Sequence, residues 1–279
     1  MGQPQNGIFV SAMIDSIRRL RIPMRWELFW YVRRLRQETQ RYNSAHSSAY
    51  PQGDGRFLYA SPIGRSGKPW LRKLIERFGF DRFDYLIFAY DDVMLEEEIF
   101  QKCRIVREKG LRWYFLKEYI TPEVCESYSH IFLWPDDIDV GDFDPCAFVE
   151  IMRTNNLELA QPALTEDSFF SWDITLRNEK YKVGRYVDFV EIMAPVFTQE
   201  AWKSYWRMVE PDGNYWGWGY DIFARAVCGY TNMGIIDLLP VRHVRPVGKE
   251  SGGSRSLEEM MEKYGKSRSA KKVSYGPLR

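Results

Sequence analysis

The chain has 279 residues, of which 45% are hydrophobic and 16% are aromatic, enough to bury one substantial core or one core with a small attached lobe. Its formal net charge of +1 is unevenly distributed: residues 1–50 carry eight Arg and Lys against three Asp and Glu, residues 245–279 carry nine against four, and the stretch between them is acidic. An acidic middle suits cations, and basic ends suit anionic surfaces.

Two classes of protein are excluded by the cysteines and the hydropathy pattern. Cys103, Cys125, Cys146 and Cys228 are far apart and form no CxxC pair, which argues against a zinc site and a disulfide framework and favours a reducing compartment. No window approaches the roughly 18 to 20 apolar residues of a membrane span, and no signal peptide is evident. We therefore expect a cytoplasmic protein.

Residues 1–55 read as a basic extension followed by a linker. Residues 8–42 predict one or two helices, broken near Pro23, in which eight arginines are interspersed with aromatic residues. Such a segment could lie on an anionic membrane surface, or it could pack on the main domain with its arginines paired or solvated. The polar residues 43–55 are typical of a linker.

Strands and helices alternate from Arg56 onward. Short apolar runs predict strands, and amphipathic runs predict helices between them. The expected strands are 57–60, 85–90 and 130–134, and the expected helices are 67–78 and 112–126. This alternation indicates a mostly parallel, buried sheet whose ligands lie at the carboxyl ends of the strands, where Ser61, Asp91, Asp92 and the acidic residues after Trp134 fall.

The second half is less regular. The residue pattern predicts helices at 145–153, 199–209 and 222–228, and strands at 157–161, 172–176, 188–193 and 234–238. The Gly-, Ser- and Lys-rich residues 249–279 predict a mobile tail. The main domain is therefore expected to span residues 56–248.

An acidic cluster follows the strand that ends at Trp134. In an extended segment residues i and i+2 point the same way, so Asp137 and Asp139 can face one pocket while Asp136 faces elsewhere or binds ribose. Oxygen ligands suit Mg²⁺ or Mn²⁺, and such an ion can complete its coordination with phosphate oxygens and water. The alternative is an acidic turn that caps the next helix.

His243 follows the last predicted strand, between Arg242 and Arg245. An imidazole among guanidinium groups is biased toward its neutral, metal-binding form, so His243 is a candidate third ligand, although a lone loop histidine is often structural. Arg242 and Arg245 could equally neutralise a diphosphate.

The loop at 216–221 combines aromatic residues, glycines and one carboxylate. The aromatic faces of Trp216, Trp218 and Tyr220 could stack on the sugar rings of an acceptor, and Asp221 could accept a hydroxyl proton. The alternative is a packed aromatic turn in which Asp221 caps the following helix. These two roles of Asp221 are compatible.

These residues resemble nucleotide-sugar glycosyltransferases of the GT-A type. The strings Tyr128–Asp137, Leu159–Leu164 and Phe189–Phe197 resemble more closely an uncharacterised, plant-rich, glycosyltransferase-like family known only as a domain of unknown function, over residues 56–248. The Trp-Gly-Trp-Gly loop is similar to that of inverting galactosyltransferases, although Tyr220 stands where an acidic residue is usual. The lack of an anchor resembles stand-alone enzymes of large algal viruses, for which xylose is a plausible donor.

The resemblance implies a GT-A (Rossmann-like) fold, a single domain with a mixed, mostly parallel central sheet flanked by helices and an N-terminal helical extension. It implies an inverting glycosyltransferase that moves xylose or galactose from a UDP-sugar to a hydroxyl of a glycan or glycoprotein. Asp137, Asp139 and His243 would hold Mn²⁺ or Mg²⁺, and Asp221 would be the base. The donor would be bound by Ser61, Asp91, Asp92, Trp113, Lys117, Asp136, Arg242 and Arg245.

Two other classes of function remain open. A sugar- or nucleotide-binding module without catalysis would use the aromatic residues as a lectin-like platform and the acidic cluster for a structural metal. A peripheral membrane or interaction protein would act through residues 8–42. Only the basic ends support a nucleic-acid partner, and we expect none.

Overall fold

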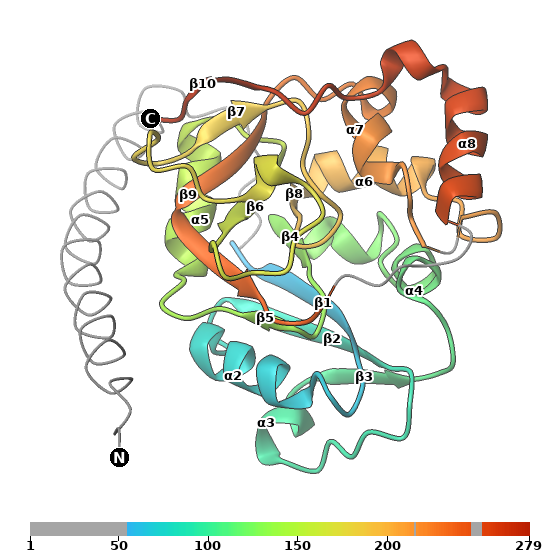
Figure 1. Ribbon diagram of the computed structural model, residues 1–279. Helices are drawn as coiled ribbons and strands as arrows, with labels where there is room; N and C mark the ends of the chain where they lie inside the picture. Colours follow the sequence, from blue (N-terminus) through green and yellow to red (C-terminus); the bar gives the residue numbers. More distant parts are fainter. Residues whose placement is uncertain (1–54, 215, 247–252) are drawn as a thin grey trace, which may run out of the picture. The chain divides into compact units, whose positions relative to one another are not determined.

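A mixed sheet forms the centre of the chain (Figure 1). The computed structural model describes residues 55–214, 216–246 and 253–279, which belong to one unit, Tyr50–Arg279. Across these described residues the strand order is β10-β7-β9-β6-β8-β4-β1-β2-β3, and β5 pairs separately with β9. The strands are β1 (Phe57–Ile63), β2 (Phe83–Ala89), β3 (Arg104–Arg107), β4 (His130–Leu133), β5 (Ile138–Asp139), β6 (Leu159–Leu164), β7 (Arg185–Val187), β8 (Val196–Thr198), β9 (Met233–His243) and β10 (Ser274–Pro277).

Helices cover both faces of this sheet (Figure 1). They are α2 (Lys68–Phe78), α3 (Glu98–Gln101), α4 (Arg112–Tyr119), α5 (Pro145–Thr154), α6 (Gln199–Met208), α7 (Tyr220–Cys228) and α8 (Gly253–Tyr264), with short 3₁₀ turns at Val124–Ser127, Asp173–Thr175 and Lys266–Arg268. The predicted fold class, a mixed α/β sheet flanked by helices, is confirmed.

The alternation of side chains along β1 explains the layers. Leu58 and Ala60 enter the core shared with α4, α6 and α7, whereas Tyr59 points the other way, onto Phe78 of α2. Because β1 is buried on both faces, its sequence is a continuous apolar run rather than an alternating one. The parallel pairs β1–β2 and β1–β4 follow the predicted pattern, and β2 also pairs in parallel with β3, a strand that the sequence analysis does not predict.

The second half of the sheet is mostly antiparallel. Strand β8 pairs antiparallel with both β4 and β6, and β7 pairs antiparallel with β9; β6 and β9 are parallel. Two predicted strands are wrong: residues 172–176 contain a 3₁₀ turn, and residues 188–193 form the connection between β7 and β8. Both stretches contain apolar residues at strand-like spacing because they pack against the core, not because they pair.

The C-terminal segment differs from the predicted mobile tail. Helix α8 places Met260 in the core, β10 extends the sheet by pairing with β7, and Leu278 is buried. The segment is polar overall, but these few apolar anchors and the strand pairing hold it in the main unit. The tail is therefore part of the domain.

The predicted basic helices at 8–42 and the linker at 43–55 lie outside the described residues, apart from Gly55. Within residues 55–214, 216–246 and 253–279, no helix combines the length and the apolar character needed to cross a membrane.

Candidate functional site

The two-residue strand β5 assembles the candidate site. It pairs antiparallel with the end of β9, matching Ile138 with His243, and the Val244 N–H donates to the carbonyl oxygen of Asp137 at 3.1 Å. Residues that follow β4 and residues that end β9, 106 positions apart in the case of Asp137 and His243, therefore meet at one edge of the sheet. Polar groups at the carboxyl end of parallel strands are the usual ligand site in open α/β sheets.

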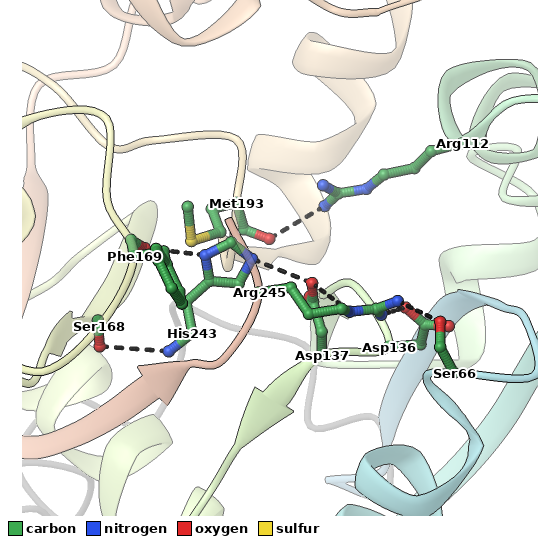
Figure 2. Close-up of polar contacts among 9 residues, drawn as sticks. All are labelled: Ser66, Arg112, Asp136, Asp137, Ser168, Phe169, Met193, His243 and Arg245. Atoms are coloured by element: carbon green, nitrogen blue, oxygen red, sulfur yellow. Dashed lines mark hydrogen bonds and ion pairs between the residues drawn. The ribbon is translucent and has the colours of Figure 1, made fainter. Parts of the chain in front are cut away.

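Arg245 bridges the two adjacent carboxylates of Asp136 and Asp137 (Figure 2). Its Nε lies 3.0 Å from Asp137 Oδ2, another guanidinium nitrogen pairs with Asp136, and a third donates to Ser66 Oγ at 2.6 Å. Burial raises the pKa of Asp136, although the Gly64 N–H, which donates to it at 2.9 Å, and Arg245 oppose that rise. The site thus holds two carboxylates and its own cation.

His243 contacts the same carboxylate group from the other side. Its Nε2 lies 3.2 Å from Asp137 Oδ2, and its Nδ1 lies 2.8 Å from the carbonyl oxygen of Phe169. Burial alone would raise the pKa of Asp137, but His243 and Arg245 outweigh it and lower that pKa. Burial alone would lower the pKa of His243, but Asp137 outweighs it and raises that pKa.

The hydrogen bonds of His243 determine what can lie between it and Asp137. The Phe169 carbonyl only accepts, so Nδ1 carries hydrogen, and a neutral ring then turns the lone pair of Nε2 toward a carboxylate oxygen. His243 Nε2 and Asp137 Oδ2 lie 3.2 Å apart, and their facing lone pairs would repel each other unless a proton or a metal ion lay between them. The other carboxylate oxygen, Asp137 Oδ1, is buried with no hydrogen-bond partner among the described residues. Asp137 and His243 therefore fit a divalent cation that completes its coordination with phosphate oxygens and water.

Asp139 does not join this pair. Its carboxylate accepts from Lys73 Nζ at 2.6 Å and from the Gly141 N–H at 3.2 Å. Asp137 lies in a turn, so the side-chain alternation of an extended strand does not extend back from Asp139 to it. Within the described ranges, no three His, Cys, Asp or Glu side chains are grouped so that they could hold a metal, and the predicted trio is corrected to a pair.

Asp91 and Asp92 lie where the sequence places them, after β2 and beside the loop that follows β1. Asp91 accepts from the Arg65 N–H at 3.1 Å, and Asp92 forms an ion pair with the Arg65 guanidinium. Both carboxylates are exposed. They remain available to a nucleotide, and their part in donor binding stays a prediction.

Three other predicted donor-binding residues are engaged elsewhere. Ser61 is fully buried and donates to the Pro62 carbonyl at 2.9 Å. The Lys117 ammonium donates to the Trp206 carbonyl at 2.7 Å and lies 3.7 Å from the centre of that ring. Arg242 pairs with the exposed Asp167 at 3.0 Å, because neighbouring residues of a strand point to opposite faces and His243 points to the site. The part of these three residues in donor binding stays a prediction.

The aromatic loop has an exposed and a buried part. Trp216 and Trp218 are more than a third exposed, as an acceptor platform requires. Tyr220 is buried and accepts from the Glu210 N–H at 2.8 Å, so its predicted contact with the acceptor is corrected. Trp113, predicted to approach the donor, is buried against Gly217, where a Cβ atom would lie 1.9 Å from its Nε1. The ring of Trp113 therefore packs against the loop at 216–221 and supports it.

Two further carboxyl groups are buried, one on α7 and one on the connection between β7 and β8. Asp221 is in the first turn of α7, where its Oδ1 accepts from the Ile222 N–H at 2.8 Å, and burial raises its pKa to about 6. Glu191, in the connection between β7 and β8, is close enough to Asp221 and His243 for their charges to shift its pKa. Burial, and then the charge of Asp221, raise the pKa of Glu191 to about 7.

A family profile described as "Protein of unknown function (DUF707)" matches residues 31–188 and 185–275. The chain belongs to the DUF707 family. No curated protein matches this chain significantly.

Solved structures show only a weak likeness to this DUF707 protein. Residues 1–349 of S. aureus TarS give a TM-score of 0.49 at 7% identity, over 67% of this chain and 59% of that one. The same fragment in complex with UDP-GlcNAc gives 0.49 at 8%, over 75% and 65%. A197 from STIV gives 0.41 at 12%, over 68% and 86%. The chain spans less than two thirds of the TarS fragment, and scores at this level support no argument about fold or function.

Two side chains of this DUF707 protein were missed in the sequence. Arg112 is half-buried and donates to the carbonyl of Leu133 and to that of Met193, the second contact being drawn in Figure 2, and desolvation lowers its pKa to about 10. Its Nε has no partner among the described residues. Glu191 could have been noticed as a single charge within the apolar run Phe189–Phe197, since such a charge is costly to bury without a purpose.

An aromatic loop between β6 and β7 was also missed. Phe169, Phe170 and Trp172 are each more than a third exposed. Two hydrogen bonds hold the loop against His243: Ser168 Oγ accepts from the His243 N–H at 3.2 Å, and the Phe169 N–H donates to the His243 carbonyl at 3.1 Å. The sequence pattern assigns no element to Phe169 and Phe170 and wrongly places Trp172 in the predicted strand 172–176, so the pattern does not reveal the loop.

Proposed function

We propose that this DUF707 protein is a metal-dependent glycosyltransferase that uses a UDP-sugar, with inversion at the anomeric carbon. The observation that carries the proposal is the Asp137–His243 pair. It offers a buried, unpartnered carboxylate oxygen and a fixed imidazole at the carboxyl end of a parallel strand, with a guanidinium beside it. A carboxylate and an imidazole with free positions for phosphate are what a diphosphate-bound cation needs.

The residues around the pair have distinct parts in this reaction. A divalent cation bound there would offset the negative charge that develops on the leaving diphosphate. Arg245 and Arg112 present guanidinium groups that could turn toward phosphate oxygens. Asp91 and Asp92 lie at the next strand end, where ribose or base would be bound. Either of the two buried carboxyls, Asp221 or Glu191, could take the proton of the attacking hydroxyl.

The exposed aromatic side chains support a glycan acceptor. Trp216 and Trp218 on one loop, and Phe169, Phe170 and Trp172 on another, are exposed, and the second loop is hydrogen-bonded to His243. Aromatic rings bind the apolar faces of sugars with a large contact area and little loss of side-chain entropy. A glycan or glycoprotein hydroxyl is therefore the acceptor class that we propose.

Thermal shift with UDP-sugars, with and without Mn²⁺ or Mg²⁺, tests the proposal. A ligand that binds only the folded protein raises its apparent stability by about 2.7 kcal/mol at 100 times its Kd. We expect a shift that needs both donor and metal and that is lost in Asp137→Asn. Asp142→Asn is the matched control, since Asp142 is an exposed aspartate five residues away, on the connection between β5 and α5. UDP-xylose and UDP-galactose are the first donors to test. No metal-dependent shift with any UDP-sugar would remove the proposal.

A sugar- or nucleotide-binding module without catalysis is the second candidate, favoured by the exposed aromatic loops. It predicts binding of the donor but no release of UDP on prolonged incubation with metal. Measuring UDP release separates it from the enzyme.

A further inference from the structure

Glu191 is a buried carboxyl group with an unused oxygen. The residue is 4% exposed, and its Oε2 has no hydrogen-bond partner among the described residues. Burying an unpaired carboxylate oxygen is unfavourable, by more than the loss of an ordinary hydrogen bond. A protein tolerates this where the oxygen serves a purpose, such as receiving a hydrogen-bond donor that arrives with the substrate.

The backbone around Glu191 is held from two directions. Its N–H donates to Oε1 of the buried Gln161, in β6, at 2.5 Å. Two residues later the Met193 carbonyl accepts from Arg112, which approaches from α4 (Figure 2). The side chain is therefore carried by a segment fixed to the sheet and to a helix, although that segment is itself neither strand nor helix. Such support is what a reacting group needs.

The neighbours of Glu191 place it inside the candidate site. The charges of Asp221 and His243 both act on the pKa of Glu191, and the Ser171 side chain, in the aromatic loop that ends at Trp172, lowers that pKa. Glu191 thus lies among the metal-binding candidate His243, the aromatic loop and the start of α7.

Asp221 is placed differently, although it is equally buried. Its Oδ1 accepts from the N–H of Ile222 at 2.8 Å, and the backbone N–H groups of Asp221 and Ile192 also favour its charged form. One oxygen of Asp221 is thus occupied by the backbone of its own helix, α7. A general base needs a lone pair directed at the proton it removes, and Glu191 has one to spare.

We propose that Glu191 is the catalytic base of the transfer and that Asp221 is a positioning residue that holds the Glu191 segment against α7. The inference rests on the proposed function. The acceptor oxygen forms a bond to the anomeric carbon, the bond from that carbon to the phosphate oxygen breaks with its electron pair leaving on UDP, and the hydroxyl proton passes to Glu191. Burial supports this role, because it brings the pKa of Glu191 to about 7, near working pH.

Release of UDP from a UDP-sugar, with water as the acceptor, tests the inference in the full-length protein. Removing a general base costs on the order of 10²- to 10⁴-fold in rate, so we expect Glu191→Gln to lower kcat by at least about 100-fold. Its affinity for UDP, measured by calorimetry with Mn²⁺, should stay within about threefold of wild type. Glu191→Asp, which keeps the carboxyl but withdraws it, should retain part of the activity. Glu179→Gln, at an exposed glutamate, is the matched control.

Asp221→Asn separates the two carboxyls. As a positioning residue it should lose less kcat than Glu191→Gln and should lose stability as well. Glu191→Gln with a kcat within about threefold of wild type would overturn the inference while leaving the proposed function intact. A wild-type protein that neither binds a UDP-sugar nor releases UDP would overturn both.

Discussion

Replacing Arg245 by Gln tests the charge balance of the site. The variant removes the guanidinium that lies between Asp136 and Asp137, two carboxylates whose side chains are 7% and 12% exposed, and leaves them facing each other. Removing one partner of a fully buried ion pair costs about 3 to 5 kcal/mol. The Arg245 side chain is about one-third exposed, and solvent screens part of that penalty. We therefore expect a loss of about 2 kcal/mol in the free energy of unfolding.

A divalent cation should offset that loss. It carries positive charge to the same carboxylates, so Mn²⁺ is expected to stabilise Arg245→Gln more than it stabilises the wild type. Urea unfolding at pH 7, with and without saturating Mn²⁺, measures both values. The matched control is Arg242→Gln, three residues earlier, whose partner Asp167 is exposed and which should change stability by less than about 0.5 kcal/mol. Equal losses in the two variants, or no extra effect of Mn²⁺ on Arg245→Gln, would refute the reasoning.

Three further predictions concern the surroundings of the site. Gly67→Ala places a Cβ atom 1.8 Å from Asp136 Oδ2 and should cost about 1 to 3 kcal/mol in urea unfolding, whereas Gly213→Ala, in open space, should be near neutral. Burial raises the pKa of Glu191 to about 7 in the folded protein, so its favourable contribution to stability is present at low pH and is lost as pH rises through 7. Between pH 5 and pH 8, the free energy of unfolding of Glu191→Gln should therefore increase relative to that of the wild type by up to about 3 kcal/mol. Met260→Ala removes a buried contact of α8 with Asn214 and Gly219. It should lower the free energy of unfolding by about 2 kcal/mol and speed amide hydrogen exchange in the loop that contains Gly219.

Each of these predictions has an outcome that contradicts it. Gly213→Ala as harmful as Gly67→Ala would mean that the close approach to Asp136 is unimportant. A stability difference between Glu191→Gln and wild type that does not change with pH would place the pKa of Glu191 at its ordinary value. Unchanged exchange in Met260→Ala would mean that α8 does not hold the loop.

The sequence predicts the parallel part of this fold well. Strands β1, β2 and β4 are mostly apolar runs because they are buried on both faces, and the acidic residues that follow β2 and β4 mark the ligand edge. Periodicity does not reveal the two-residue β5, which is too short to have a period, nor β10, whose residues are mostly exposed. Yet β5 is what joins Asp137 to His243.

The candidate site was predictable in its residue types but only partly in its geometry. Asp137 and His243 were chosen for their chemistry and do meet, whereas Asp139 was chosen by an alternation that the turn at Asp137 interrupts. The positions of the other site residues depend on contacts between segments far apart in the sequence. Arg112 turns toward the end of β4 only because α4 packs against that part of the sheet, and no local pattern reports such a contact.

Strand β9 determines when this protein can fold during synthesis. It lies between β6 and β7, pairs with β5 at its end, and is followed directly by Arg245, yet it is nearly the last strand of the chain. A nascent chain that has not yet released residues 233–245 from the ribosome lacks an inner strand and leaves Asp136 and Asp137 without their counter-charge. Folding of this sheet must therefore wait until residues 233–245 have been released, and the high sequence separation of these contacts makes it slow.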